Sequence, residues 1–233
     1  MITVAKYHSD TEPARVEMAS QSLCKSQTRR FIMDKLLIAS DIHGSAYYCE
    51  RLCERIAEEK PERIILLGDI LYHGPRNDLP RDYDPKKIID MLNPLKDYFL
   101  CVRGNCDTEV DQMVLDFPIM AEYAVFLLGD ETVYATHGHH AGEAAPPPHR
   151  PGDILLCGHT HIPACTWHED FLYMNPGSTS IPKNGSRNSY MVWEKGDFYW
   201  KDVTDGTTYH KRQKNIRTLR ERIKAEAANA AKQ

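Results

Sequence analysis

Short apolar runs of strand length alternate with amphipathic stretches through the first two thirds of the chain. Five of these runs are rich in Ile, Leu, Val and Tyr, residues that favour β-strands. The five runs are Leu36–Ser40, Ile64–Gly68, Phe99–Gly104, Thr132–Thr136 and Ile154–Gly158. Between them, residues 46–60 and 85–97 repeat apolar side chains at helical spacing, and Thr108 with Asp111 forms a capping-box pattern that begins a short helix. Pro94 is expected to shorten or kink the second of these helices.

Strand patterns dominate the rest of the chain. Residues 121–128, 163–174 and 189–203 are rich in strand-forming side chains, and Gly196-Asp197 predicts a turn within the last segment. An alternating α/β order that gives way to strands predicts a two-sheet α/β sandwich with helices on the outside. The length suits a single domain with an ample core.

Composition narrows the class of protein. The chain has 233 residues, of which 42% are apolar and 27% charged, as in globular proteins. No apolar run approaches the length that spans a bilayer, so no membrane role is expected. Seven cysteines without regular spacing indicate a reducing compartment, and we expect a cytoplasmic protein. The net charge is −4, which argues against broad binding to nucleic-acid backbones.

The two ends of the chain lie outside these patterns. Residues 1–32 contain no strand or cap signal, and we expect a leader that is disordered or not native to the fold, followed by one domain over 33–204. Residues 205–233 carry eight Lys and Arg against three Asp and Glu. This basic tail is a solvated surface or a contact for an anionic partner. A helix is predicted over 210–233, with an apolar stripe of Ile216, Leu219 and Ile223.

Each of the five apolar runs is followed by side chains that can bind a metal ion. They are Asp41 and His43, Asp69, Asn105, His137, and the pair His159 and His161. Ligands bind at the carboxyl ends of the strands in open α/β sheets, so these side chains are expected to converge. Asp and His are also common turn residues, but five strand ends in one order favour a shared site. In extended chain, each i and i+2 pair would point into the same cavity.

The motifs at these strand ends resemble those of the calcineurin-like metallophosphoesterases. The shared motifs are DIHG at Asp41–Gly44, GD at Gly68-Asp69, GN at Gly104-Asn105, THGH at Thr136–His139 and GHTH at Gly158–His161. Three further segments are similar to the YfcE-type phosphodiesterase branch of that family. They are LYHGPRN at Leu71–Asn77, VRGNCDTEVDQM at Val102–Met113 and NPGSTSIPK at Asn175–Lys183. The resemblance extends from about Met33 to about Val203.

This resemblance implies a four-layer α/β/β/α sandwich and a centre of two metal ions. One ion would be held by Asp41, His43, Asp69 and His161, and the other by Asp69, Asn105, His137 and His159, so that Asp69 bridges the two. Four imidazoles among the ligands shift the metal preference from Mg²⁺ toward Mn, Fe, Co, Ni or Zn, and we expect Mn²⁺ first.

We therefore predict a two-metal phosphodiesterase that acts on a small or generic phosphodiester, with a metal-bridging hydroxide as nucleophile. The predicted catalytic residues are Asp69, Asn105, Arg103 and His73. Arg76, like Arg103, either contacts phosphate or forms a surface ion pair. Cys106 stands where many family members have the His that protonates the leaving group, which leaves His73 and His139 as candidates for that role.

Three alternatives are compatible with the same sequence. The chain could be a phosphomonoesterase, or an enzyme of larger substrates such as a protein phosphatase or nuclease. It could also be a non-catalytic protein-interaction scaffold, like the metallophosphoesterase-fold subunit of the retromer coat. Scaffolds tend to lose metal ligands, whereas all seven are present here. The sequence allows both a monomer and a homo-oligomer.

Overall fold

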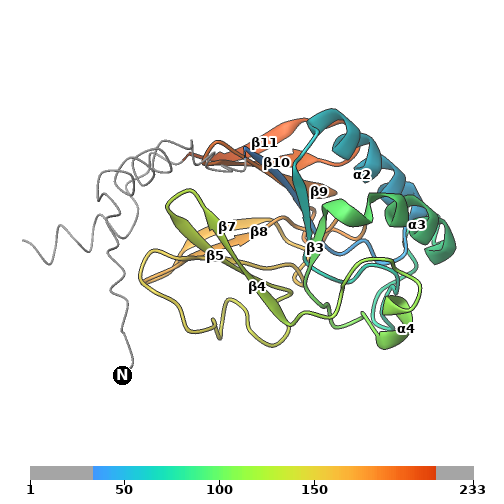
Figure 1. The fold of residues 1–233 in the computed structure, drawn as a ribbon, viewed down its shortest axis with the longest axis horizontal. Coiled ribbons are helices and arrows are strands. Elements are labelled where there is room, and N and C mark those ends of the chain that lie inside the picture. The colour runs from blue at the N-terminus through green and yellow to red at the C-terminus, as the bar shows by residue number, and fades with distance from the viewer. Residues whose placement is uncertain (1–33, 214–233) are drawn as a thin grey trace, which may run out of the picture. The chain divides into compact units, whose positions relative to one another are not determined.

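Two β-sheets form the framework of residues 34–213, the part of the chain that the computed structural model describes (Figure 1). The larger sheet has six strands in the order β11-β10-β9-β1-β2-β3. Its members are β1 (Lys35–Ala39), β2 (Arg63–Leu66), β3 (Phe99–Cys101), β9 (Ser189–Glu194), β10 (Asp197–Asp202) and β11 (Thr208–Arg212). Strands β1, β2 and β3 are parallel, and β9, β10 and β11 extend the sheet in antiparallel fashion.

The second sheet has five strands in the order β4-β5-β6-β8-β7. Its members are β4 (Tyr123–Leu128), β5 (Glu131–Thr136), β6 (Ile154–Leu156), β7 (Ala164–Trp167) and β8 (Leu172–Asn175). Strands β5, β6 and β8 are parallel, with an antiparallel strand at each edge. Each sheet therefore has a parallel centre whose strands end on the same side.

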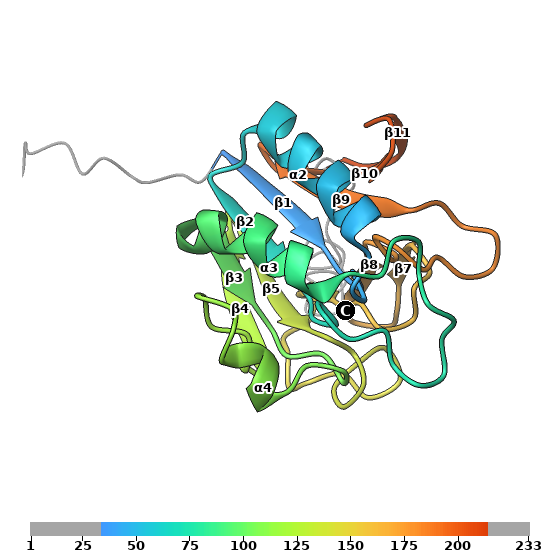
Figure 2. The same cartoon turned by 90° about the vertical axis from the view of Figure 1, so that its right-hand side faces the viewer.

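Helices α2 (Ala46–Glu59) and α3 (Pro85–Leu92) cover the outer face of the six-stranded sheet, and Figure 2 looks onto this layer. The 3₁₀-helix η1 (Asn93–Tyr98) continues α3 as far as β3, and α4 (Glu109–Gln112) is a single short turn. The Ser45 side chain caps α2, and Asp84 caps α3 ahead of Pro85. Within residues 34–213, no helix has both the length and the apolar character needed to cross a membrane.

Strand β1 lies at the centre of two hydrophobic layers. Leu37 and Ala39 point toward the helices, where they join the cluster that includes Leu52 of α2. Leu36 and Ile38 point the other way and pack between the two sheets. All four strand side chains are completely buried, as expected for a parallel strand that is covered on both faces.

The predicted two-sheet α/β sandwich is confirmed. The five apolar runs form β1, β2, β3, β5 and β6, and the capping box at Thr108 is present. The predicted helix over 85–97 becomes α3 followed by η1, because Pro94 cannot continue the α-helical hydrogen bonds. The segment 163–174 is two antiparallel strands, β7 and β8, and not one.

The predicted boundary at residue 204 and the start of the tail helix at 210 are wrong. Residues 208–212 form β11, which pairs with β10 at the edge of the six-stranded sheet. Arg212 at its end is buried and forms a two-pronged ion pair with buried Glu131 of β5. This edge strand thus links the two sheets. The rest of the predicted tail helix and the predicted leader 1–32 lie outside the described residues.

Candidate metal centre

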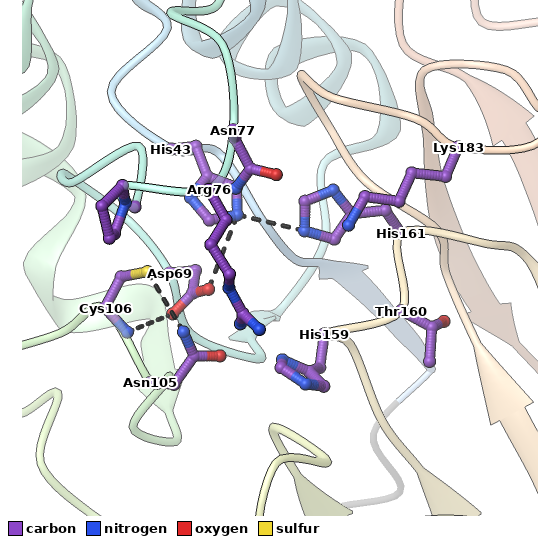
Figure 3. Close-up of a pocket in the computed structure, with 12 residues that line it drawn as sticks. His43, Asp69, Arg76, Asn77, Asn105, Cys106, His159, Thr160, His161 and Lys183 are labelled. Carbon is purple, nitrogen blue, oxygen red and sulfur yellow. Dashed lines mark hydrogen bonds and ion pairs between the residues drawn. The ribbon is translucent and has the colours of Figure 1, made fainter.

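The carboxyl ends of five strands bring the seven predicted ligands to one site. Asp41 and His43 follow β1, Asp69 follows β2 and Asn105 follows β3, all from the six-stranded sheet. The five-stranded sheet supplies His137 after β5, and His159 and His161 after β6. Five of the seven line one cavity of about 470 Å³ (Figure 3), namely His43, Asp69, Asn105, His159 and His161. The other two, Asp41 and His137, lie beneath it and are buried.

The backbone at these positions differs from the extended chain that the i, i+2 argument assumed. Asp41, His43, Asp69, His159 and His161 all have φ between 51° and 66°, in the left-handed region. Asp and His adopt this conformation more readily than most residues, although it is uncommon for any side chain other than glycine. The members of each pair do converge. Tight turns at the strand ends orient their side chains, and the alternation of side chains along a strand does not.

Asp41, His43 and His161 form the first group of potential ligands. Oδ1 of Asp41 lies 3.5 Å from Nε2 of His43 and 3.2 Å from Nε2 of His161. The two imidazole nitrogens are 3.1 Å apart. Three ligand atoms within such distances of one another could hold one metal ion.

Asp69 lies between this group and a second one. Its Oδ2 is 3.5 Å from Nε2 of His43 and 3.4 Å from Nε2 of His137. Nε2 of His137 is 3.1 Å from Oδ1 of Asn105, and the His159 ring lies 5.0 Å from the His137 ring, centroid to centroid. A single carboxylate oxygen therefore faces ligand atoms of both groups.

Backbone carbonyls fix the orientation of three of the imidazoles. The pairs, each from ring Nδ1 to carbonyl oxygen, are His43 with Tyr72 at 2.8 Å, His137 with Leu67 at 2.6 Å and His161 with Ile181 at 2.6 Å. A carbonyl can only accept, so in the neutral imidazoles, the form that binds metal, these contacts assign the proton to Nδ1 and leave the lone pair on Nε2. This is the arrangement that metal-binding histidines use.

The electrostatics of the site favour cations. Burial acts to raise the pKa of Asp41, but the neighbouring imidazoles of His161 and His43 outweigh it and hold this pKa well below its usual value. Burial acts to lower the pKa of His137, but the carboxylates of Asp69 and Asp41 raise it to about 9. The pKa of His43 is raised against burial by the same two carboxylates. Two buried, ionised carboxylates thus attract positive charge to this point.

The arrangement of ligand atoms around Asp41 is a second reason to expect divalent ions. Oδ1 of Asp41 is buried and has no hydrogen-bond donor, although two imidazole nitrogens lie close to it. With their protons on Nδ1, His43 and His161 face each other with two lone pairs 3.1 Å apart. Acceptors gathered around a buried carboxylate oxygen need a cation between them. Imidazoles and carboxylates together suit transition metals.

Two glycines allow the Asp69 and Asn105 loops to pack against each other. A Cβ added to Gly68 would lie 2.3 Å from the backbone nitrogen of Gly104, and one added to Gly104 would lie 2.1 Å from Oδ1 of Asp69. Neither neighbour can move aside, because backbone or a ligand carboxylate occupies the space. The glycines before Asp69 and Asn105 are therefore part of the construction of the site.

Asp107 is a site residue that the sequence reasoning missed. Its buried carboxylate accepts hydrogen bonds from the backbone N–H groups of Asp69 at 2.8 Å, Gly104 at 2.7 Å and Ile70 at 2.9 Å. Burial raises the pKa of Asp107 and the charge of Asp69 adds to this, while the three N–H donors act against it. One side chain thus ties the Asp69 loop to the Asn105 loop. Its only signal in the sequence is its place inside the VRGNCDT motif.

Two of the residues predicted to act in catalysis lie away from the cavity. The guanidinium of Arg103 donates to the carbonyl of Asp107 at 3.3 Å and lies 3.6 Å from Glu122, which is the ion-pair alternative. His73 packs its ring against Tyr72 and Tyr83, and it is absent from the cavity lining.

His139 is the other candidate for proton transfer, and Cys106 stands in the place of the usual family histidine. Burial, with the charge of Asp69, raises the pKa of the Cys106 thiol to about 12, and the thiol lies on the cavity wall. His139 contacts the rings of His137 and His159, and burial and these neighbouring imidazoles lower its pKa to about 4.

Comparison with known families identifies this fold and site. Residues 35–197 match the family model of the calcineurin-like phosphoesterase superfamily domain. The chain therefore belongs to the calcineurin-like phosphoesterase superfamily. The predictions of this family and of an enzyme that hydrolyses phosphoesters are confirmed.

Individual relatives agree with this assignment. The chain is 46% identical over 158 residues to phosphodiesterase YfcE of Escherichia coli strain K12, which covers 68% of this chain and 86% of that protein. A solved structure of YfcE, a phosphoesterase from E. coli, aligns with a TM-score of 0.75 and 40% identity over 78% of this chain and 100% of that one. Vacuolar protein sorting 29 from Cryptosporidium parvum shares the fold, with a TM-score of 0.51, 20% identity, and coverage of 77% and 98%.

Proposed function

We propose that this protein is a phosphodiesterase that uses two divalent transition-metal ions, with Mn²⁺ as the preferred metal. The observation that carries this proposal is the position of Asp69 Oδ2, 3.5 Å from Nε2 of His43 and 3.4 Å from Nε2 of His137. One oxygen that faces two ligand groups is what a bridging carboxylate requires. The 46% identity to a phosphodiesterase supports the diester over the monoester.

The distances between the proposed ligands divide them into two groups. Asp41, His43 and His161 would hold one ion, and Asn105, His137 and His159 the other, with Asp69 shared between them. When bound, the ions would polarise the phosphoryl oxygens and lower the pKa of the attacking water. Five of these ligands are neutral, so only two carboxylate charges oppose the ions and the site keeps a net attraction for a phosphate anion.

Hydrogen bonds within the protein hold the side chains of this site in position. Carbonyls of Leu67, Tyr72 and Ile181 hold three imidazoles in one tautomer, and Asp107 fixes the two loops that carry Asp69 and Asn105. Asn105 is exposed and His159 half-buried, so these two members of the second ligand group lie on the open side of the cavity, where a substrate enters. Six described cysteines are free thiols, which agrees with a cytoplasmic enzyme.

The test is metal-dependent hydrolysis of bis(4-nitrophenyl) phosphate. Chelated protein should be inactive, and added Mn²⁺ should restore more activity than Mg²⁺, because imidazoles prefer transition metals. His43→Asn should lose the activity, whereas His168→Asn should keep it, because His168 lies outside the cavity beside Glu143. Full activity in excess chelator would refute the metal mechanism, and faster turnover of 4-nitrophenyl phosphate would favour a monoesterase.

A further inference from the structure

Two basic side chains line the cavity beside the metal ligands without a function in the hydrolysis proposed above. Arg76 and Lys183 belong to different loops and reach the cavity from different sides (Figure 3). Among residues 34–213, neither makes an ion pair or a side-chain hydrogen bond, unlike Arg103 or Lys201, which face carboxylates. Both residues are exposed, so these two unpaired cations in one cavity are free to bind an anionic ligand.

The loop that carries Arg76 is fixed to the site. The backbone N–H of Asn77 donates to the carbonyl of Gly74 at 3.3 Å, and its side-chain amide donates to the carbonyl of His73 at 2.8 Å. Gly74 has a φ of 76°, and a Cβ there would lie 3.1 Å from Sγ of Cys106. The turn that presents Arg76 is thus packed on the residue that follows the ligand Asn105.

The loop that carries Lys183 is fixed to a different ligand. Its backbone N–H donates to the carbonyl of His161 at 3.2 Å. Two residues earlier, the carbonyl of Ile181 accepts from Nδ1 of His161 at 2.6 Å. The position of the Lys183 main chain is therefore coupled to that of the His161 ring. Both cations have anchored backbones and long side chains that can close on a ligand.

The charge of the cavity exceeds what a simple phosphodiester needs. With two divalent ions, Asp41 and Asp69 would leave two positive charges, and Arg76 and Lys183 raise the total to four. A phosphodiester carries one negative charge. The rest of the cavity wall is polar or small, with Gly74, Pro75, Asn77 and Thr160, and it offers no aromatic ring other than imidazole and no long aliphatic chain. A nucleobase or an acyl chain would find little apolar surface there, with Pro75 and Cys106 as the apolar side chains of the lining.

We propose that Arg76 and Lys183 bind a second anionic group, a carboxylate or a further phosphate, on the ester arm of a small phosphodiester. This inference rests on the proposed diesterase function and specifies its substrate class. Charge-assisted hydrogen bonds from guanidinium and ammonium groups are the strong contacts that such a group requires. The preferred substrate is then a compact, polar diester with at least two negative charges.

The experiment compares two diesters with the same 4-nitrophenolate leaving group. One carries a 2-carboxyethyl ester arm and the other the uncharged 2-carbamoylethyl arm, which has nearly the same shape. The Mn²⁺-loaded protein should favour the carboxylate by about tenfold in kcat/KM, mainly through KM. Arg76→Gln and Lys183→Gln should each reduce this ratio, and the double variant should bring it close to one. Arg63→Gln, at the far end of β2, should keep the wild-type ratio.

A binding measurement gives a readout that does not depend on turnover. Calorimetry with 3-phosphonopropionate and its terminal carboxamide should show the same preference in the Mn²⁺-loaded wild type and its loss in the double variant. Equal rates and equal affinities for charged and uncharged forms would overturn the assignment, as would a preference that survives in the double variant. If the wild type cleaves neither diester, the proposed function fails, and the affinity ratio still decides the roles of Arg76 and Lys183.

Discussion

Replacing Asp107 with Asn should damage the metal centre without touching any ligand. The carboxylate accepts three backbone N–H bonds, two at Oδ2 from Asp69 and Gly104 and one at Oδ1 from Ile70. An amide has one acceptor oxygen, so one of these sites must face an NH₂ group, and a donor would then oppose a donor. The change keeps the size of the side chain and removes only its acceptor chemistry.

The cost follows from these contacts. A hydrogen bond to a charged group contributes about 1.5–3 kcal/mol, and a neutral one about 0.5–1.5 kcal/mol. If the amide oxygen replaces Oδ2, two bonds weaken and the bond from Ile70 is lost. Burying a neutral amide in place of a charge recovers part of this loss. The net decrease in the free energy of unfolding should be about 2–4 kcal/mol.

Urea unfolding of the chelated protein measures this decrease, and calorimetric titration with Mn²⁺ measures the effect on the site. Loss of a hydrogen bond that orients ligands typically lowers metal affinity by about 10- to 100-fold. The control is Asp116→Asn, an exposed carboxylate 3.9 Å from Lys96, which should change stability by less than about 0.5 kcal/mol. If Asp107→Asn matches the control in both stability and affinity, the carboxylate does not hold the two loops together.

Three further predictions concern the bridge, the leaving group and the end of the domain. Asp69→Asn should lose more activity than His43→Asn and should lose both ions in elemental analysis, and retention of two ions would exclude a shared carboxylate. With the Cys106 thiol as a weak acid, rates in a series of aryl phosphodiesters should fall steeply as the leaving group becomes more basic, and a flat dependence would reveal an efficient proton donor. Arg212→Met should destabilise the protein by about 3–5 kcal/mol, because it leaves Glu131 buried without its partner. Adding Glu131→Leu should restore most of that loss, and a single variant as stable as the wild type would show that β11 is not a structural link.

The sequence predicts the strands and the convergence of the seven proposed ligands well because both depend on local chemistry. Leu36–Ala39 is apolar at every position, as a strand buried on both faces must be, and the prediction needs no knowledge of what covers it. The ligands follow such strands directly, and parallel strands in one sheet end on one side. The order of strands and motifs therefore places seven side chains near one another before any coordinates are known.

What the sequence could not supply depends on contacts between distant segments. Asp107 is close to Asn105 along the chain, but two of its three donors belong to the loop at Asp69 and Ile70, 38 and 37 residues away. Lys183 enters the cavity only because its loop folds back onto His161. The sequence of β11, Thr208–Arg212, is short and rich in polar residues, which is typical of a basic tail. Only its pairing with β10 defines it as a strand.

Five of the proposed ligands have a left-handed backbone, and this backbone links the missed contacts to the proposed function. Non-glycine residues in that region persist only where the surroundings hold them, at a cost of order 1–3 kcal/mol each. Here the holding groups include the carbonyls that accept from the imidazoles, the Asp107 carboxylate, and the hydroxyls of Ser178 and Ser180, which both donate to the carbonyl of Asp41. Ions that bind only the ordered ligands must stabilise the fold in proportion to their affinity. A change that loosens the loops should therefore lower the stability of the chelated protein as well as its metal affinity. Loss of a ligand alone should lower only the metal affinity and the stabilisation that the metal confers.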